Sequence, residues 1–592
     1  MPVSILLSIT LPLGLAALLA LPAARALTWR LIPLAALPAL ALALLAPVPL
    51  SVSGDWLLMG ASFGLTEVSR LFLGFTALLW IAAAAAARHW FRGAERATGF
   101  AVCFLMAMTG NLGLILAQDA LGFYAFFALM SFASYGLVIH ARSAAALSAS
   151  WVYIVFVIAG ELALFAGLAL AVAEADSRLL ADLRVTELSE LAAALLIAGF
   201  AVKLGVMPLH FWLPPAHGAA PVPASAVLSG AMIKAGLYGM LATLPFGLQA
   251  LPDHGTVLMA AGLVTVFAAV ILGLNQDSPK TVLGYSSVSL MGLIALGLGA
   301  GLLAPAAWPA LLPVLVFLAA HHALAKGALF LGAGLYGAQT GSAGRALVLA
   351  TLAVPAAVLA GLPMTSGALG KEALKSAFAA GSTAWLPWLT VALTLSGVAT
   401  TILMARFAVT LWRAAPPAPA AARPEALALP ALGLAAAALA LPLAWPAAAG
   451  ALAAPILAAA PSDPWPIALG ALIAFGAMIR AHALAIGPQT FLRQLASPAA
   501  LLADRAATLA ARKRRALRRL ARQAPAAVGD RAAQWRLGQT AIAGLIVAVF
   551  AIETMAPRAP DTEQEEPAAE TPANPFNATL PPPGSGPAAP GP

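Results

Sequence analysis

Runs of about twenty apolar residues recur along almost the whole chain, and they constrain its fold more than any other feature. A helix needs a run of roughly that length to cross the hydrocarbon core of a bilayer. Hydrophobic residues make up 62% of the 592 residues and charged residues only 9%, and a soluble protein of this size could not solvate such a surface. The sequence therefore predicts an all-α polytopic membrane protein.

From these runs we predict about sixteen transmembrane helices. The first run begins close to Met1 and lacks a basic leader, so we expect a retained span and not a cleaved signal peptide. The predicted spans are 3–22, 31–50, 67–87, 98–117, 120–140, 151–174, 189–207, 222–244, 256–274, 283–303, 309–336, 346–378, 385–411, 426–449, 464–484 and 538–556.

Lysine and arginine predict the orientation, because loops on the cytoplasmic side carry an excess of both. Placing the N-terminus outside makes every second loop cytoplasmic. Those loops then contain Arg25, Arg30, Arg88, Arg92, Arg96, Arg142, Lys280, Arg345, Arg413 and Arg423. We therefore expect a multi-pass protein of the inner (plasma) membrane with an external N-terminus.

The segment 486–537 is the most basic part of the chain, and this orientation places it in the cytoplasm. It is rich in Ala, Leu and Arg, so we predict an amphipathic helix on the membrane surface, held by anionic lipid or by a partner subunit. A solvated flank of the last span is the alternative. Residues 557–592, rich in Pro, Ala and Glu, predict a disordered tail.

Composition also excludes several classes of function. The only cysteine is Cys103, which excludes a disulfide framework and a cysteine-ligated iron–sulfur cluster within the chain. No metal-cluster or nucleotide-loop motif is present, so we expect no metal site and no cofactor in this chain. The net charge of +9 comes from loops between spans, where it signals topology; we expect no nucleic-acid partner.

Titratable side chains inside predicted spans are the strongest functional signal, because a charge at membrane depth is costly unless it has a partner or water. Those positions are Glu161, Lys203, Lys234, His322, Lys326 and Lys371. His322 and Lys326 are four residues apart and so share one helix face. Four further residues are possible accessories to this set: His210, His217, His321 and Glu372.

Two of the lysines lie beside helix breaks. Pro208 follows Lys203 by five residues, and Pro363 precedes Lys371 by eight, with Gly367 between. A proline frees backbone groups, which a membrane helix tolerates only where it lines protein or a wet cavity. Paired interrupted helices in corresponding segments indicate an inverted-repeat transporter, so the seventh and twelfth spans are predicted to be broken.

Lysine suits proton transfer, because an amine removed from water releases its proton in a way that arginine does not. Histidine relays protons at physiological pH. A single lysine near a helix end can instead reach the interface with its amine, but four lysines, two beside breaks, favour a proton path. His210 and His217 are alternatively explained as loop caps, and a structural role for His321 is equally open.

The chain resembles the antiporter-like proton-translocating subunits of respiratory complex I, membrane-bound hydrogenases and multi-subunit cation/proton antiporters. The resemblance covers about 100–410 and rests on Lys203 to Ser225, Lys280 to Gly292, His322 to Gly334 and Leu362 to Lys371. It implies two inverted five-helix repeats, with Lys203 as the central lysine of the first half-channel and Lys234 as the connecting lysine. It further implies that His322 and Lys326 link the halves and that Lys371 is at the exit.

One departure from the family bears on the mechanism. The family usually has a glutamate in the fifth span, paired with the lysine of the seventh, and the matching residue here is Ala128. Glu161 could take over that role, or pumping could be lost. Thr281 and Leu290 are smaller departures from positions where arginine and a polar residue are common.

These features predict N-terminal transmembrane helices (1–97), an antiporter-like proton-translocating core (98–412), C-terminal transmembrane helices (413–485), the basic segment (486–537), a last span (538–556) and the tail (557–592). We expect a non-catalytic, proton-translocating subunit of an NADH:quinone oxidoreductase-like, hydrogenase-like or antiporter complex. Its partners would be other membrane subunits and redox or other cytoplasmic subunits. The alternatives are a Na⁺/H⁺ antiporter subunit and a non-pumping membrane anchor for a soluble enzyme.

Overall fold

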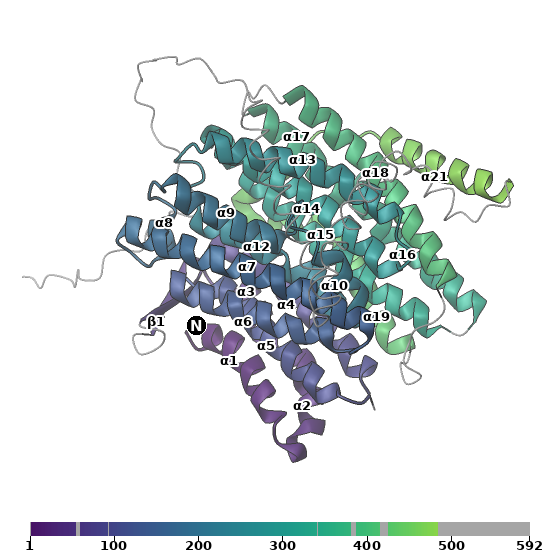
Figure 1. Ribbon diagram of the computed structural model, residues 1–592, viewed down its shortest axis with the longest axis horizontal. Helices are drawn as coiled ribbons and strands as arrows, with labels where there is room; N and C mark the ends of the chain where they lie inside the picture. Colours follow the sequence, from purple (N-terminus) through teal and green to yellow (C-terminus); the bar gives the residue numbers. More distant parts are fainter. Residues whose placement is uncertain are drawn as a thin grey trace, which may run out of the picture.

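The computed structural model describes residues 2–54, 60–92, 94–339, 341–380, 386–414 and 424–483, and Figure 1 shows these residues as a bundle of helices with one small sheet. In chain order the elements are α1 (Pro2–Leu18), α2 (Arg25–Leu31), α3 (Leu37–Leu45), β1 (Leu50–Gly54), β2 (Ala61–Leu65), α4 (Glu67–Trp90), α5 (Ala97–Leu116), α6 (Ala120–Ile139), α7 (Ala144–Ala175), α8 (Leu180–Leu183), α9 (Glu190–Leu204), α10 (Leu213–Ala219), α11 (Val222–Val227), α12 (Lys234–Thr243), α13 (Pro252–Leu274), α14 (Pro279–Leu303), α15 (Trp308–Ala338), α16 (Ser342–Ala360), α17 (Ser366–Ala380), α18 (Leu386–Arg413), α19 (Pro424–Ala449), α20 (Ala454–Leu457) and α21 (Trp465–Ala483). Short 3₁₀ turns join several of the helices.

The described part of the chain contains twelve helices that are long and apolar enough to cross a membrane, so the protein is a multi-pass membrane protein. Twelve of the predicted spans have counterparts among them. The predicted spans 3–22, 189–207 and 464–484 correspond to α1, α9 and α21, which are not among the twelve. The span 538–556 lies outside the described residues, so the count of sixteen stays a prediction.

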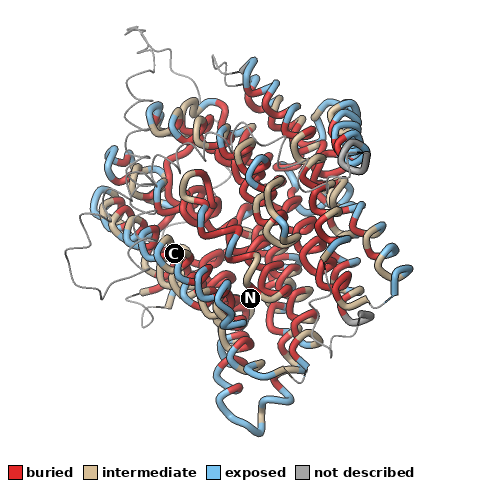
Figure 2. The backbone as a smooth tube through the Cα atoms, turned by 45° about the vertical axis from the view of Figure 1, so that its right-hand side comes forward, coloured by how far each residue is buried: buried red, intermediate tan, exposed pale blue. Residues whose placement is uncertain are grey.

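The interior of the bundle is built around α14 and α15. Helix α15 packs against α4, α14, α16, α17 and α19. The apolar stretch with which this helix could cross a membrane is buried throughout. Figure 2 shows buried backbone through the middle of the bundle and exposed backbone along its outer helices. Side chains on α15 are therefore shielded from lipid by other helices, which makes it a place where polar groups can be stabilised.

Helices α13 and α14 approach each other through two reciprocal glycine pairs. A Cβ at Gly262 would lie 2.8 Å from Gly292 O, and one at Gly292 would lie 2.7 Å from Gly262 O. Gly255 and Gly299 meet in the same way, at 2.7 and 2.6 Å. The two glycines of each helix are seven residues apart, so they lie on one face. Small residues at such positions let membrane helices pack closely.

The predicted C-terminal end of the second span, 31–50, was wrong, because the helix ends at Leu45. The all-α prediction also missed a two-stranded sheet. The helix ends at Leu45 because Pro47 and Pro49 follow, and residues at and before a proline disfavour helix. Strand β1 begins at Leu50 and pairs antiparallel with β2, Leu50 opposite Leu65. The hairpin is joined to the N-terminus of α6, where Asp119 accepts from the N–H groups of Gly122 and Ser62.

Two other predicted spans are interrupted. The span 346–378 forms two helices, α16 and α17, because Gly361 ends α16 at a φ of 100° and Pro363 follows. The span 222–244 contains a π-helical segment, Leu228–Met232, between α11 and α12. The predictions for 486–537, 538–556 and 557–592 lie outside the described residues.

Replacing Gly262 by alanine should destabilise the protein, because the added methyl group would meet the backbone of α14. Overpacking of this kind typically costs about 1–3 kcal/mol. Thermal unfolding of the detergent-solubilised protein measures the effect. Gly433→Ala on α19 is the matched control, since a Cβ there meets nothing within 4 Å. Equal unfolding temperatures for the two variants would contradict close packing of α13 on α14.

Candidate functional site

The four lysines predicted within spans are all buried by the fold. Lys203 is 4% exposed, Lys234 1%, Lys326 0% and Lys371 7%. Among the described residues, none of their amines lies within 4 Å of a carboxylate. Each amine instead contacts a hydroxyl, a ring nitrogen or a backbone carbonyl. These contacts satisfy hydrogen-bond donors of each amine, and none of these contacts is an ion pair.

Lys203 lies in the last turn of α9, opposite α6. Its Nζ donates to Ser131 Oγ at 2.8 Å and lies 5.4 Å from the centre of the Phe127 ring. Glu161 on α7 is 5% exposed. Its carboxyl lies within electrostatic range of Lys203, and its Oε2 is buried without a hydrogen-bond partner among the described residues. The structure thus brings Glu161 and Lys203 into electrostatic range of each other.

The break after Lys203 is held by side chains that follow it. Gly205 ends α9 with a φ of 78°, a conformation that glycine adopts without strain. Trp212 Nε1 donates to Val202 O at 2.8 Å, and Met207 N donates to Thr265 Oγ1 at 2.9 Å. These bonds satisfy backbone groups that the interruption would otherwise leave unpaired.

Lys234 and His322 are in direct contact. Lys234 Nζ lies 2.5 Å from His322 Nδ1 and donates to Ser229 O at 2.5 Å. Ser229 belongs to the π-helical segment, whose altered pairing brings this carbonyl to the amine. A proton can lie on either side of the contact between amine and imidazole, because both groups can donate or accept in one of their states.

A pair of serine hydroxyls connects the Lys234 cluster with Lys326. Ser229 Oγ lies 2.7 Å from Ser287 Oγ, and Ser287 Oγ also donates to Leu283 O at 3.1 Å. Lys326 Nζ donates to the same carbonyl at 2.8 Å. Ser287 has one hydroxyl proton, so Ser229 is the donor when Ser287 bonds Leu283. Neither serine was among the predicted site residues.

His321 reaches toward α17, away from the contact made by its neighbour His322. Ser366 Oγ donates to Ala438 O at 3.1 Å and lies 2.9 Å from His321 Nδ1. Because its only proton is directed to the carbonyl, Ser366 accepts from His321, which places a proton on Nδ1 of that ring. His321 therefore connects α15 to the helix that bears Lys371.

Lys371 points back to the end of α16. Its Nζ donates to Ala360 O, the last residue of that helix, at 3.0 Å. Carbonyls at a helix C-terminus lack a partner and carry partial negative charge, so they stabilise a cation. Glu372 does not pair with Lys371; it forms an ion pair with Lys375 at 2.8 Å.

His210 and His217 are buried beside the first break. His217 stacks on Phe330 with ring centres 4.8 Å apart and lies within electrostatic range of Lys234, Lys280 and Lys326. His210 lies against Phe211, with ring centres 4.5 Å apart. His217 is thus close to the lysine clusters, whereas His210 lies among aromatic rings.

Two further cations, half-buried Lys280 and buried Arg406, were not predicted as site residues. Lys280 Nζ donates to Ala220 O at 2.5 Å, at the end of α10. Arg406 on α18 is 1% exposed and donates to Gln276 O at 2.6 Å and to Asp277 Oδ1 at 3.2 Å. Both lie close to predicted span ends, where the sequence suggests only topology signals. Arg406 lies within the predicted span 385–411, and a charged residue inside a span is the signal that could have identified it.

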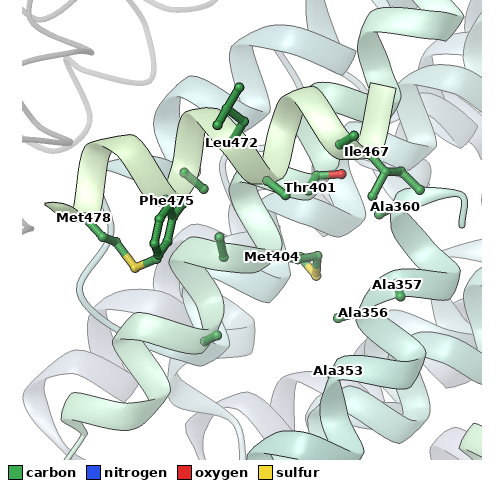
Figure 3. Close-up of a pocket in the computed structure, with 15 residues that line it drawn as sticks. Ala353, Ala356, Ala357, Ala360, Thr401, Met404, Ile467, Leu472, Phe475 and Met478 are labelled. Atoms are coloured by element: carbon green, nitrogen blue, oxygen red, sulfur yellow. The ribbon is translucent and has the colours of Figure 1, made fainter. Parts of the chain in front are cut away.

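The described residues contain no group of three or more His, Cys, Asp or Glu side chains that could hold a metal ion. A cavity of about 710 Å³ lies between α16, α18 and α21 (Figure 3). Its lining is almost entirely apolar, and the Thr401 hydroxyl in it donates to Gly397 O of its own helix. Ala360, whose carbonyl accepts from Lys371 Nζ, is one of the lining residues, so the cavity borders the Lys371 contact.

Part of the chain is similar in sequence to a known family. Residues 117–400 match the family described as "NADH:quinone oxidoreductase/Mrp antiporter, TM". The match confirms the resemblance predicted for about 100–410 and includes all six residues of the predicted path.

Relatives come from three kinds of complex. The chain is 34% identical over 255 residues to "Hydrogenase-4 component B" of Escherichia coli (strain K12), covering 41% of this chain and 38% of that protein. It is 32% identical over 289 residues to a Na⁺/H⁺ antiporter subunit of Bacillus subtilis (strain 168), covering 46% and 57%. It is 31% identical over 252 residues to an NADH-quinone oxidoreductase subunit of Desulforudis audaxviator, covering 41% and 49%. The matched region thus spans only part of each relative.

Solved structures share the fold. A chain of the Mrp complex from Dietzia sp. DQ12-45-1b gives a TM-score of 0.66 at 24% identity, covering 96% of this chain and 64% of that one. A chain of respiratory complex I from Thermus thermophilus gives 0.62 at 24% identity, covering 79% and 99%. The likeness in fold extends beyond the family domain.

Ser287→Ala should destabilise the protein more than Ser229→Ala. Loss of Ser287 leaves the buried Ser229 hydroxyl without its acceptor, which costs about 1–3 kcal/mol. Loss of Ser229 leaves Ser287 bonded to Leu283 O, so less than about 1 kcal/mol is expected. Thermal unfolding of both variants and of the double variant measures the difference. A larger loss in Ser229→Ala would contradict the direction of the bridge.

Proposed function

We propose that the chain is a proton-translocating membrane subunit of a multi-subunit redox-driven or antiporter complex. The observation that carries the proposal is the direct contact of Lys234 with His322, inside a series of buried lysines that lack carboxylate partners within 4 Å among the described residues. The relatives named above belong to three kinds of such complex. The driving reaction would then belong to partner subunits.

Protons would enter near Lys203 and Glu161, pass through Lys234, His322 and Lys326, and leave by Lys371. Close packing supports the first transfer, because a Cβ at Gly236 would lie 2.6 Å from Phe200 O and 2.8 Å from Leu204 N. Lys203 and Lys234 thus extend from adjoining stretches of α9 and α12. The Ser229–Ser287 bridge supports the transfer toward Lys326, and His321 with Ser366 connects α15 to α17.

We also propose the repeat arrangement and topology predicted from the sequence. Two interrupted helical segments, one between α9 and α10 and one between α16 and α17, support two inverted five-helix repeats with breaks in the seventh and twelfth spans. The sixteen spans, the inner-membrane location, the external N-terminus, and the domain boundaries at 97, 412 and 485 belong to the same proposal.

Exchange of Na⁺ for H⁺ is a second candidate function. The match to the Na⁺/H⁺ antiporter subunit of Bacillus subtilis favours it. Efflux of radioactive sodium that is lost on replacement of Lys203 would support this candidate.

Lys203→Ala and Lys326→Ala should each abolish proton movement, because either change removes a proton-binding group from the middle of the path. The complex that co-purifies with the tagged chain is reconstituted in liposomes containing a pH-sensitive dye. A potassium diffusion potential then drives proton uptake. Lys326→Met, which keeps most of the side-chain volume, separates loss of the amine from loss of packing.

Lys375→Ala is the control, because Lys375 is a partly exposed lysine paired with Glu372 on the same helix. Its uptake should equal that of the wild type. Assembly, followed by the subunits that co-purify, should be unchanged in all variants. Wild-type uptake in both Lys203→Ala and Lys326→Met would rule out the path and favour a non-pumping anchor for a soluble enzyme.

A further inference from the structure

We propose that the Ser131 hydroxyl connects Lys203 to Glu161 and passes a proton between them. The charge partner of Lys203 then comes from α7, in place of the acid that α6 lacks at Ala128. This inference rests on the proposed function and assigns a role to a residue that the sequence analysis did not select.

Ser131 occupies the position between the two charged groups. Its oxygen accepts from Lys203 Nζ at 2.8 Å. The Glu161 carboxyl lies within electrostatic range of Lys203, and its Oε2 is buried without a hydrogen-bond partner among the described residues. The side chain is fully buried. Lys203 is a donor in this contact, so the serine proton is available to the carboxylate.

The hydroxyl of Ser131 has a different kind of hydrogen-bond partner from the hydroxyls of nearby serines. Ser134 on the same helix donates to Met130 O, and Ser150 on α7 donates to Leu147 O at 2.9 Å. Such bonds to the preceding turn are usual for serine in helices. Among the described residues, the Ser131 hydroxyl instead accepts a hydrogen bond from Lys203 Nζ.

The backbone of Ser131 is held in place from α7. Tyr153 Oη donates to Ser131 O at 2.9 Å. The Tyr153 ring meets the Trp212 ring edge-on, with centres 5.3 Å apart, and Trp212 Nε1 donates to Val202 O. The same pair of aromatic side chains therefore positions Ser131 and the residue next to Lys203.

Helices α7 and α9 are close together beside the two charged residues. A Cβ at Gly199 would lie 2.9 Å from Gly160 O, and one at Gly160 would lie 3.0 Å from Val202 Cβ. Gly160 and Val202 are the residues before Glu161 and Lys203. This contact holds the segment of α7 that bears Glu161 against the segment of α9 that bears Lys203.

The transfer is balanced by two coupled proton movements. An N–H bond of the Lys203 ammonium breaks as its proton moves to Ser131 Oγ, and the original Ser131 O–H bond breaks as that proton moves to a Glu161 oxygen. Lys203 ends as a neutral amine and Glu161 as a neutral carboxylic acid, and the serine is unchanged. The reverse transfer restores the ion pair. Tyr124 and Tyr153 are the other titratable groups within electrostatic range of the carboxyl.

Proton uptake into liposomes by the co-purified complex tests the link through a double-variant comparison. Ser131→Ala should lower uptake about tenfold or more, in the range of lost acid–base groups, and Ser131→Thr should restore most of it. In the Glu161→Gln background, Ser131→Ala should have no further effect, since the link is already absent. Ser150→Ala should behave as wild type, because its hydroxyl bonds only its own helix.

Infrared spectroscopy separates this proposal from the proposed function. The carboxyl band of protonated Glu161 is assigned as the band absent in Glu161→Gln. It should move to higher wavenumber in Ser131→Ala, because the protonated carboxyl loses the Ser131 oxygen to which its O–H donates. An unmoved band, or equal losses of uptake in both backgrounds, would overturn the role of Ser131. A moved band without uptake by the wild type would contradict proton translocation but keep the Ser131–Glu161 bond.

Discussion

Each buried lysine amine must find an acceptor inside the protein, and the arrangement of the helices depends on this requirement. Removing an ammonium from water costs several kcal/mol unless hydrogen bonds replace the lost solvent. The fold supplies these bonds mostly from neutral groups: Ser131 for Lys203, Ser229 O and His322 for Lys234, and Leu283 O for Lys326. Neutral acceptors hold an amine in either protonation state, whereas a close carboxylate would favour the charged state alone.

Irregular helices provide several of these acceptors. Lys371 bonds the last carbonyl of α16, and Lys280 bonds a carbonyl at the end of α10. Lys234 bonds a carbonyl of the π-helical segment. In a regular helix these carbonyls would be engaged by the backbone. The breaks that cost stability in the membrane are therefore also the places where cations are held, which explains why lysines and breaks occur together in the chain.

The sequence predicted twelve of the helices that can cross a membrane, but not the contacts between their side chains. Apolar runs identified twelve spans because length and hydropathy act locally, and Pro363 with Gly367 indicated the second break. The π-helical segment and the hairpin were missed, although Pro47 and Pro49 signalled the end of the helix before β1. Ser131, Ser229 and Ser287 could not be found, because a serine in an apolar helix has no distinctive pattern. Their roles depend on which helix faces them.

The most direct test of the account is the proton flux of the wild-type complex in liposomes that contain no sodium, with choline as the replacement cation. The account predicts that an imposed potential drives the same rate of internal pH change in choline as in sodium, because protons alone pass along the lysines. No pH change in either medium, or a change that requires sodium, would contradict proton translocation through this chain.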